Sequence, residues 1–380
     1  MTSYTDTILT IDLNSIIRNY LLLKKELNQV ECGAVVKADA YGIGANHITS
    51  TLSKYGCKHF FVANLDEAIT LRSTLTTQHK IYVLHGIFPN QEQEFINYNL
   101  IPILNDIYQI KIWNSFALTQ NVKLPAIIHI DTGLSRLGLS LNDALTLFYN
   151  QTLVSNLDIL YLMSHLSAAN DLDHYLNYEQ LKKIQIIQKY MPNNHITFVN
   201  SSGIFLGSQY HFHLARPGMA LYGLNPTPTK NNPMHNVVCL FSNIIQIRKH
   251  IKKSPVGYSG SYYAQKNSVI ATVAIGYADG YFRSLGNNGI CYIAGYKTQV
   301  VGRISMDLIT LDVTHIPAHL IYPGQSVEII GDNITVDQLA SYSNTLGYEV
   351  LTNLSNRFKR IYNNYNLSHD ISVMFNNKVI

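Results

Sequence analysis

Residues 34–44 read AVVKADAYGIG and place Lys37 directly after a short apolar run. The run is typical of a buried strand, and the small residues behind it are typical of a turn. A lysine at such a strand end faces a pocket in which desolvation lowers the pKa of its ammonium group and makes the amine nucleophilic. A lysine that forms a Schiff base needs these properties. The alternative is an ordinary strand-end lysine that points to water.

The region around this stretch alternates apolar strands with amphipathic helices up to about residue 230. Eight alternating strands predict a parallel sheet closed into a TIM-type (β/α)8 barrel. An open doubly wound sheet is the alternative, but it usually has fewer strands and a Gly-rich dinucleotide turn, which this sequence lacks. We expect helices at 44–54, 65–73 and 175–190, among others, and strands at 34–36, 59–63, 80–84, 100–104, 126–130, 159–164, 196–200 and 213–215.

The pattern changes after Pro233, where strand-like runs joined by Gly- or Pro-containing turns replace the alternation. One clear helix interrupts them at 336–346, with Thr335 as its cap. These features predict a second, mostly β domain. We therefore expect a barrel domain at 11–231, a β-strand domain at 232–365 that residues 1–10 join, and a tail at 366–380. The strands of the second domain are expected at 237–248, 269–276, 289–293, 298–304, 308–313 and 326–330.

Composition excludes several classes of protein. The chain has 380 residues, 47% hydrophobic and 14% charged, which suits two domains with large cores. The net charge of +4 is spread out, and we interpret the basic cluster at 248–253 as a solvated loop rather than a nucleic-acid contact. Four cysteines without CxxC spacing fit a reducing cytoplasm and no metal site. No signal peptide and no membrane-spanning run is found.

Polar residues follow five of the predicted barrel strands. In a barrel of this kind, the residues at the C-terminal ends of the strands form the active site. A histidine in such a place can instead be a hydrogen-bonded core residue, and an arginine can belong to a rim ion pair. The shared position at strand ends favours a common site. The residues are Lys37, Arg136, His165, the pair Asn200–Ser201, and Arg216.

These segments resemble motifs of the alanine racemase family. Residues 34–44 resemble its pyridoxal-phosphate lysine motif, with Lys37 in the cofactor-binding position and Tyr41 four residues on. Residues 130–138, IDTGLSRLG, resemble the DTGxxRLG stretch. By this likeness Arg136 lies near the substrate carboxylate and the cofactor ring oxygen.

Two further barrel segments resemble the family's cofactor-binding stretches. Residues 199–203, VNSSG, resemble the stretch that holds the phosphate, which implies that Asn200 and Ser201 bind the cofactor. Residues 216–223, RPGMALYG, resemble RxGIxxYG. The resemblance implies that Arg216 contacts the pyridine nitrogen, and that Gly218 and Met219 offer backbone N–H groups to the phosphate. Barrels usually bind phosphate after strands seven and eight, which fits these positions.

The β domain carries a candidate for a second base. Residues 274–281, AIGYADGY, resemble the GYADG motif, whose tyrosine, here Tyr277, comes from the partner subunit. Racemisation needs a base on each face of the substrate, and Lys37 is the other candidate. A free tyrosine has a pKa near 10 and needs help at neutral pH. By likeness, a His165–Arg216 relay supplies cationic character. A packed tyrosine is the alternative.

Other segments of the β domain extend the resemblance. Residues 301–307, VGRISMD, resemble VGRxxMD, which implies that Met306 and Asp307 approach the substrate pocket from the other subunit. Residues 347–350, GYEV, resemble the stretch whose tyrosine, Tyr348, lines the entrance with Tyr41. His129 departs from the family, many of whose members have a carbamylated lysine there. An imidazole cannot carry a carbamate, so we expect none.

The resemblance implies a PLP-dependent racemase that interconverts L- and D-alanine with Lys37 and Tyr277 as its two bases. It also implies a cytoplasmic homodimer with shared active sites that supplies D-alanine for peptidoglycan. The alternatives are a racemase of another small amino acid such as serine, a basic-amino-acid decarboxylase on the same barrel, and a PLP carrier. Tyr277 and the β domain argue against the last two. The size of the accepted side chain stays open.

Overall fold

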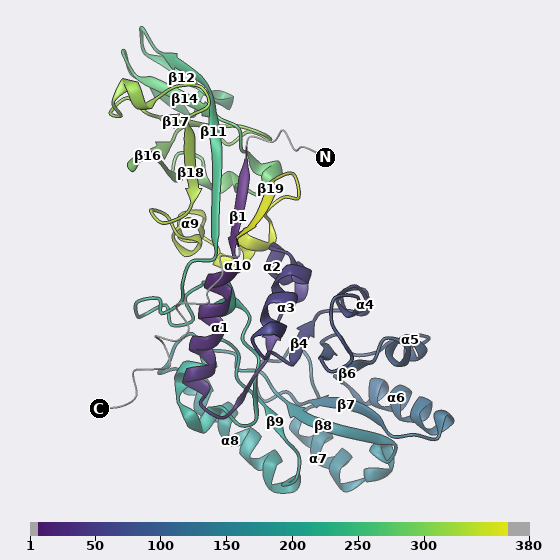
Figure 1. The fold of residues 1–380 in the computed structure, drawn as a ribbon. Helices are drawn as coiled ribbons and strands as arrows, with labels where there is room; N and C mark the ends of the chain where they lie inside the picture. The colour runs from purple at the N-terminus through teal and green to yellow at the C-terminus, as the bar shows by residue number, and fades with distance from the viewer. Residues whose placement is uncertain (1–6, 364–380) are drawn as a thin grey trace, which may run out of the picture. The chain divides into compact units, whose positions relative to one another are not determined.

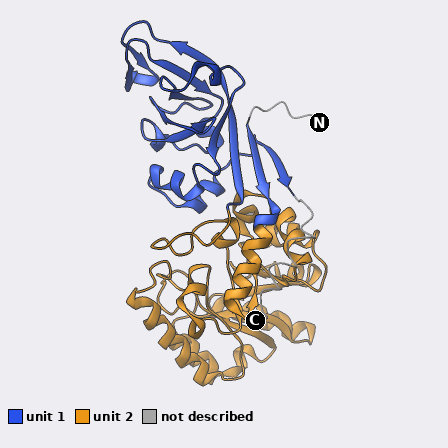
Figure 2. Ribbon diagram, turned by 60° about the vertical axis from the view of Figure 1, so that its left-hand side comes forward, with its two compact units in different colours: residues 1–15, 236–380 blue, residues 16–235 orange. Residues whose placement is uncertain are grey.

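The computed structural model describes residues 7–363, so the tail predicted at 366–380 lies outside the described residues. The chain divides into two compact units (Figure 2). One unit contains residues 16–235, and the other contains the described residues up to 15 together with those from 236 onward.

A parallel sheet forms the centre of the 16–235 unit (Figure 1). An α-helix follows each of the first six predicted strands, and short 3-10 segments follow the last two. Each of the eight predicted strands overlaps a strand of this sheet. The bounds are β3 (Ala34–Val35), β4 (His59–Val62), β5 (Lys80–Val83), β6 (Leu100–Leu104), β7 (Leu124–His129), β8 (Leu157–Met163), β9 (Ile196–Thr197) and β10 (Leu214–Ala215), with one further strand, β2 (Glu31–Cys32).

The extra strand β2 explains how the sheet closes. β2 pairs with β10, whereas β3, two residues later, pairs with β4 at the opposite end of the strand order. The two short strands are therefore halves of one strand broken at Gly33, and this strand joins both edges of the sheet. A side chain at Gly33 would lie 3.1 Å from the backbone oxygen of His59. The closed sheet confirms the predicted TIM-type barrel.

The barrel interior is packed with apolar side chains. Phe61, Tyr82, Ile103 and Ile127, from four successive strands, belong to one core cluster and are fully buried. The rings of Phe61 and Tyr82 stack with their centroids 4.6 Å apart. Burial of such side chains stabilises each by about 1.5–3 kcal/mol relative to exposure. A filled interior leaves the strand ends as the place for polar chemistry.

Several helices of this unit begin after a side-chain cap. Asn64 accepts a hydrogen bond from the Glu67 N–H, and Asp106 accepts one from the Gln109 N–H, which satisfies backbone groups that have no partner within the helix. The helices predicted at 44–54, 65–73 and 175–190 are confirmed to within one residue. The longer helices are α1 (Leu13–Leu27), α3 (Ala45–Lys54), α4 (Leu65–Arg72), α5 (Glu92–Asn97), α6 (Ile107–Gln120), α7 (Leu141–Tyr149) and α8 (Tyr175–Tyr190).

The other unit is built on an eight-stranded sheet in the order β14-β17-β16-β15-β18-β11-β1-β19. The N-terminal strand β1 pairs antiparallel with β11 and parallel with β19, so both ends of the described chain enter this sheet. The strands are β1 (Ile8–Asp12), β11 (Val238–Lys249), β14 (Val269–Val273), β15 (Ile290–Ile293), β16 (Tyr296–Val300), β17 (Ile309–Asp312), β18 (Ser326–Ile330) and β19 (Lys359–Asn363), with a separate hairpin of β12 (Ser254–Val256) and β13 (Tyr262–Ala264).

The helical part of this unit differs from the prediction. Helix α9 (Val336–Ser343) begins after Thr335, which accepts a hydrogen bond from the Gln338 N–H as expected of a cap. It ends three residues before the predicted end, because Asn344 takes a left-handed conformation with φ of 58°. A second helix, α10 (Gly347–Thr352), follows it. The expectation of a single helix was wrong, since six residues are too few to give a periodic signal.

No helix within residues 7–363 has the length and apolar character needed to cross a membrane.

Candidate active site

Lys37 lies two residues beyond the end of β3, as the sequence predicted. Its side chain is half-buried, and its amine makes no hydrogen bond or ion pair with another described residue. Burial lowers the pKa of Lys37, and the positive charge of Arg136 lowers it further, whereas the Glu67 carboxylate raises it. The net effect increases the fraction of neutral amine, which is the nucleophilic and basic form.

The turn after Lys37 is left-handed. Ala38, Asp39, Ala40 and Tyr41 have φ values of 53°, 52°, 53° and 57°. This conformation costs about 1–2 kcal/mol per residue for an L-amino acid with a side chain. The Asp39 carboxylate supports the turn by accepting a hydrogen bond from the Ala45 N–H at 2.7 Å. A short turn of small residues was predicted, but its handedness was not.

The left-handed turn places the Tyr41 ring against the segment that follows β10. The ring centroids of Tyr41 and Tyr222 lie 4.7 Å apart. A Cβ atom built on Gly218 would lie 2.5 Å from the Tyr41 hydroxyl oxygen. Glycine is therefore required at 218 for close approach rather than for backbone freedom, since its φ is −126°. Two predicted site residues, Tyr41 and Gly218, are thus neighbours.

Arg216 follows β10 directly and is 4% exposed. It donates from Nη1 to the Thr197 hydroxyl at 2.6 Å, and from Nη2 to the Ser164 carbonyl oxygen at 2.7 Å. Nη2 also lies 3.3 Å from Nδ1 of His165. Burial lowers the pKa of Arg216 to about 9, so it remains a cation at neutral pH.

His165 is the neutral member of this pair. Burial, followed by the charge of Arg216 and then that of Arg136, holds the pKa of His165 well below its usual value. Because Arg216 can only donate, Nδ1 of His165 faces a donor. The predicted His165–Arg216 pair is therefore present, with its positive charge on the arginine.

Asn200 and Ser201 connect neighbouring strand ends. Asn200 accepts a hydrogen bond from the Gly203 N–H, and its amide nitrogen lies 3.4 Å from Nε2 of His165. The buried Ser201 hydroxyl oxygen accepts from the N–H groups of Gly218 and Ala220 at 2.9 and 3.2 Å. Among the described residues, the Ser201 O–H has no acceptor, so it remains available to an anion.

The remaining N–H group of the predicted phosphate site is that of Met219. It makes no hydrogen bond with another residue of the described chain, whereas the Gly218 N–H is engaged by Ser201. The Ser201 O–H and the Met219 N–H are thus two donors in this corner of the barrel that have no acceptor among residues 7–363.

Arg136 lies in an exposed loop seven residues after β7 and makes no hydrogen bond or ion pair with the other described residues. The loop is shaped by Asp131, whose carboxylate accepts from the N–H groups of Gly133 and Leu134 at 2.8 and 2.9 Å. Arg136 therefore offers an unpaired guanidinium group near Lys37, whose pKa its charge lowers.

His129 ends β7 and is buried. Its Nδ1 lies 2.7 Å from Oδ1 of Asn105, and the Asn105 amide nitrogen donates to the carbonyl oxygens of Leu84 and Ile103. These two donations fix the orientation of the Asn105 amide, with Oδ1 toward His129. Because Oδ1 can only accept, the His129 proton is on Nδ1. Burial and the charge of Arg216 lower the pKa of His129 to about 3. The side chain is a neutral imidazole, and the absence of a carbamate stays a prediction.

The predicted residues of the β unit lie on two loops that contact each other. The N–H of Tyr277 donates to the Ser305 carbonyl oxygen, and the N–H of Ala278 donates to that of Met306, at 3.0 and 2.9 Å. Tyr277 is 41% exposed and Met306 is 55% exposed. The Tyr277 hydroxyl makes no hydrogen bond within the described part of the chain, and the guanidinium carbon of Arg283 lies 6.0 Å from the centre of its ring.

Arg357 connects the same two loops and was missed by the sequence analysis. Its Nη1 lies 2.8 Å from Asp307 and 3.3 Å from Asp279, two residues after Tyr277. No motif marked it, since its partners are about 50 or more residues away in the sequence. Tyr348 is on α10 and is 39% exposed.

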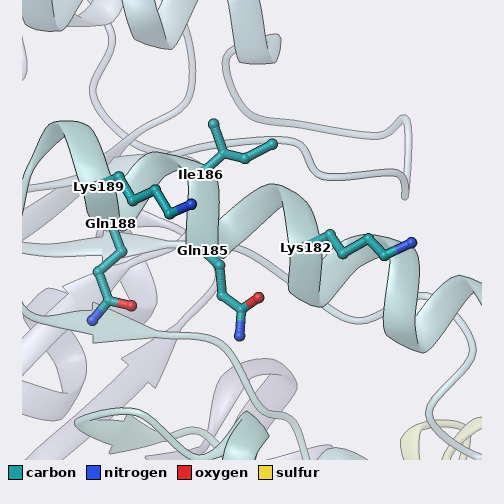
Figure 3. Close-up of a pocket in the computed structure, with 5 residues that line it drawn as sticks. All are labelled: Lys182, Gln185, Ile186, Gln188 and Lys189. Atoms are coloured by element: carbon teal, nitrogen blue, oxygen red, sulfur yellow. The ribbon is translucent and has the colours of Figure 1, made fainter.

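A separate depression lies along the exposed face of α8 (Figure 3). All of its lining side chains come from this one helix: Lys182, Gln185, Ile186, Gln188 and Lys189. Lys182 is already paired with Glu179 at 2.9 Å. None of the predicted site residues contributes, so the candidate site is the set at the strand ends. Within residues 7–363, no group of three or more histidine, cysteine or acidic residues could hold a metal ion.

The comparisons with known proteins all match one family. Residues 11–226 match the family model of the alanine racemase N-terminal domain, and residues 237–362 match that of the C-terminal domain. The alanine racemase of Rickettsia canadensis is 45% identical over 354 residues, which is 93% of this chain and 98% of that protein.

Solved structures agree with the sequence comparison. The alanine racemase of Bartonella henselae, a structure with covalently bound pyridoxal phosphate, has a TM-score of 0.91 at 39% identity and covers 94% of this chain. The whole of that chain is covered. The biosynthetic alanine racemase of Pseudomonas aeruginosa has a TM-score of 0.87 at 28% identity over 95% of this chain and all of its own. On these matches and on the site geometry, the chain belongs to the alanine racemase family.

Proposed function

We propose that this protein interconverts L- and D-alanine with pyridoxal 5′-phosphate held at the C-terminal ends of the barrel strands. The observation that carries the proposal is the placement of three donors at adjacent strand ends: the Lys37 amine, the Arg216 guanidinium and the Ser201 hydroxyl. Relatives named alanine racemase, at 45% identity over almost the full chain, support the same activity.

The donor set fits this cofactor. A Lys37 amine with a lowered pKa suits an aldehyde carbon. The free Ser201 O–H and Met219 N–H suit a phosphate, and a cation that stays charged at neutral pH, Arg216, suits a ring nitrogen that accepts a hydrogen bond. When bound, the cofactor withdraws electrons from the substrate and so acidifies its Cα–H bond.

Lys37 and Tyr277 are the two bases in this proposal. The neutral Lys37 amine can take or return a proton on one face of the substrate, because burial and Arg136 lower its pKa. The Tyr277 oxygen acts on the other face, and its exposure and free hydroxyl support this role. A ring N–H of His165 can donate to a phenolate oxygen, and Arg216 contacts the ring at Nδ1.

Arg136 is proposed to bind the substrate carboxylate. A guanidinium group forms two parallel hydrogen bonds with a carboxylate, and this one has no partner among the described residues. Such a clamp would orient the Cα–H bond toward the bases. Tyr348 and Tyr41 are proposed to line the entrance.

We further propose a homodimer in which Tyr277, Met306 and Asp307 complete the site of the partner subunit. The exposure of Tyr277 and Met306 in the single chain supports this arrangement, because large apolar side chains at the surface often mark an interface. A cytoplasmic enzyme that supplies D-alanine for peptidoglycan is the corresponding biological role. Serine remains a second candidate substrate.

The activity is tested by circular dichroism. Purified protein with pyridoxal phosphate is incubated with L-alanine, and the optical signal is followed beside Lys37→Ala and Tyr277→Phe. We expect the signal to fall to zero with alanine mass conserved, no decay in Lys37→Ala, and slower decay in Tyr277→Phe. A stable signal with the cofactor bound would contradict the proposal, and parallel incubation with L-serine tests the second substrate.

Shared sites are tested by mixing the two variants. If each site uses Lys37 of one chain and Tyr277 of the other, a mixed dimer regains one intact site out of two. Random exchange of subunits then restores about a quarter of the wild-type activity. Activity equal to the average of the separate variants would contradict a shared site.

A further inference from the structure

The carboxylate of Glu67, on α4, is fully used by backbone N–H groups at the base of the candidate site. Oε1 accepts from the Ala38 N–H at 2.9 Å, and Oε2 accepts from the Ala63 N–H at 2.8 Å. Ala38 follows Lys37 directly, and Ala63 follows the last residue of β4. One side chain therefore ties the Lys37 turn to the neighbouring strand end.

The position of Glu67 is itself fixed. Its own N–H donates to the Asn64 side chain at 3.0 Å, the contact that caps α4. The carboxylate is thus held at the start of a helix and has little freedom to follow a moving turn. It acts as a rigid anchor for whatever its oxygens bind.

The turn that it anchors needs support. The segment from Ala38 to Tyr41 is left-handed at four consecutive residues with side chains, a conformation that the chain does not prefer. At its far end, Asp39 accepts from the Ala45 N–H at 2.7 Å. At its near end, beside Lys37, the supporting side chain is Glu67.

We propose that Glu67 is a positioning residue that holds the left-handed turn behind Lys37 and thereby fixes where the Lys37 amine lies. The proposal rests on the proposed function, in which that amine moves a proton. The negative charge of Glu67 also acts on Lys37 directly, because it limits how far the pKa of Lys37 is lowered.

The substitution Glu67→Gln separates this role from simple packing. It keeps the shape of the side chain but replaces one acceptor oxygen by an NH2 group, which would face a backbone N–H donor. A half-buried N–H such as that of Ala63 is costly to leave without an acceptor, whereas the exposed Ala38 N–H can turn to water. The carboxamide oxygen should therefore stay with Ala63, and the turn should loosen at Ala38. Asp66→Asn is the matched control, since Asp66 is the preceding residue of α4, is exposed, and its carboxylate makes no hydrogen bond or ion pair with other described residues.

Hydrogen–deuterium exchange of the purified protein measures local opening of the turn independently of enzyme activity. We expect peptides that cover 37–43 to exchange about tenfold faster in Glu67→Gln than in the wild type, with no change in Asp66→Asn. Exchange over a distant control peptide, such as 336–343, should not change. Unaltered exchange over 37–43 in a folded Glu67→Gln protein would overturn the proposal.

Racemase kinetics of the same proteins test the consequence for Lys37. A misplaced amine should lower kcat about tenfold or more with little change in KM for alanine, because Arg136 is untouched. Glu67→Asp, which keeps the charge but is shorter by one methylene group, should lie between Glu67→Gln and the wild type. Faster exchange without any loss of kcat would overturn the claim that the turn positions Lys37.

The two proposals fail in different ways. A wild-type protein that does not racemise alanine contradicts the proposed function, while the exchange data still decide whether Glu67 holds the turn. An active wild type whose Glu67→Gln variant behaves like Asp66→Asn in both measurements contradicts only the role of Glu67.

Discussion

Nη2 of Arg216 lies 3.3 Å from Nδ1 of His165 while the same nitrogen donates to the carbonyl oxygen of Ser164 at 2.7 Å. A guanidinium group has no acceptor, so Nδ1 of His165 faces a donor. The Asn200 amide nitrogen lies 3.4 Å from Nε2, so the imidazole is held between two donor groups.

The Arg216 arrangement depends on Thr197. Thr197→Val keeps the shape of a fully buried side chain but removes the acceptor of the 2.6 Å hydrogen bond from Nη1, together with the donor of the 2.7 Å hydrogen bond to the Leu214 carbonyl oxygen. A buried cation that loses a partner costs about 1–3 kcal/mol of the free energy of unfolding. Urea denaturation should show this loss, whereas Thr70→Val at an exposed position of α4 should change stability by less than about 0.5 kcal/mol. Equal midpoints for the two variants would contradict the structural role of the contact.

The neutral state of His129 predicts a pH-dependent stability. Its pKa falls to about 3 in the folded protein, mainly through burial, against about 6.5 in the unfolded chain. The unfolded state therefore binds more protons between these values, and stability falls as the pH drops below about 6.5, by up to about 1.4 kcal/mol per pH unit for this residue.

The variant His129→Asn tests this contribution, because an amide can still donate to Asn105 but does not titrate. The loss of unfolding free energy between about pH 7 and about pH 5 should be smaller in His129→Asn than in the wild type. The exposed His319→Asn serves as the control and should match the wild type. Identical pH slopes for all three proteins would count against a buried neutral His129.

The close approach of Gly218 to Tyr41 predicts that substitutions at these two positions have non-additive effects. Gly218→Ala would place a methyl group 2.5 Å from the Tyr41 hydroxyl oxygen and 3.1 Å from the ring carbon that bears it. Overpacking of this kind costs about 1–3 kcal/mol, and a cost of that size carried by the cofactor-bound form raises the Kd for pyridoxal phosphate about 5- to 150-fold. The double variant with Tyr41→Phe should recover part of this loss, because the worst contact is removed. Additive effects in the cofactor titration would show that the two residues do not interact.

Removal of Arg357 should destabilise the Tyr277 loop by an amount that depends on pH. Its removal leaves the nearly buried Asp279 carboxylate without its cation and next to the charge of Asp307. Burial already raises the pKa of Asp279, and the loss of Arg357 raises it further. A raised carboxyl pKa means that stability is lost as the pH increases through it, so Arg357→Gln should be destabilised more at about pH 7.5 than at about pH 4. The converse pH dependence would rule out this coupling, and Arg357→Lys should restore most of the stability at the higher pH.

Much of the barrel could be predicted because its determinants are local. Buried parallel strands appear as short apolar runs, and polar residues directly behind them, such as Lys37 and Arg216, must lie at one end of the barrel. The break at Gly33 that closes the sheet was not predicted, because a two-residue strand such as β2 carries no periodic signal.

Contacts between distant segments account for most of what was missed. Glu67, Thr197 and Arg357 each act through a partner that is 19 to 50 residues away, and nothing in their immediate sequence indicates it. The left-handed turn at 38–41 was missed for another reason. Residues with side chains rarely adopt this conformation, so local propensity argues against it and tertiary contacts impose it.

The most direct test of two bases on opposite faces is the exchange of the alanine Cα proton in D2O, measured separately for each enantiomer by mass spectrometry. Tyr277→Phe should retain exchange from the enantiomer whose proton Lys37 removes and lose most of the exchange from the other. If Tyr277→Phe slows both enantiomers equally, or neither, Tyr277 is not the second base and the two-base account is wrong.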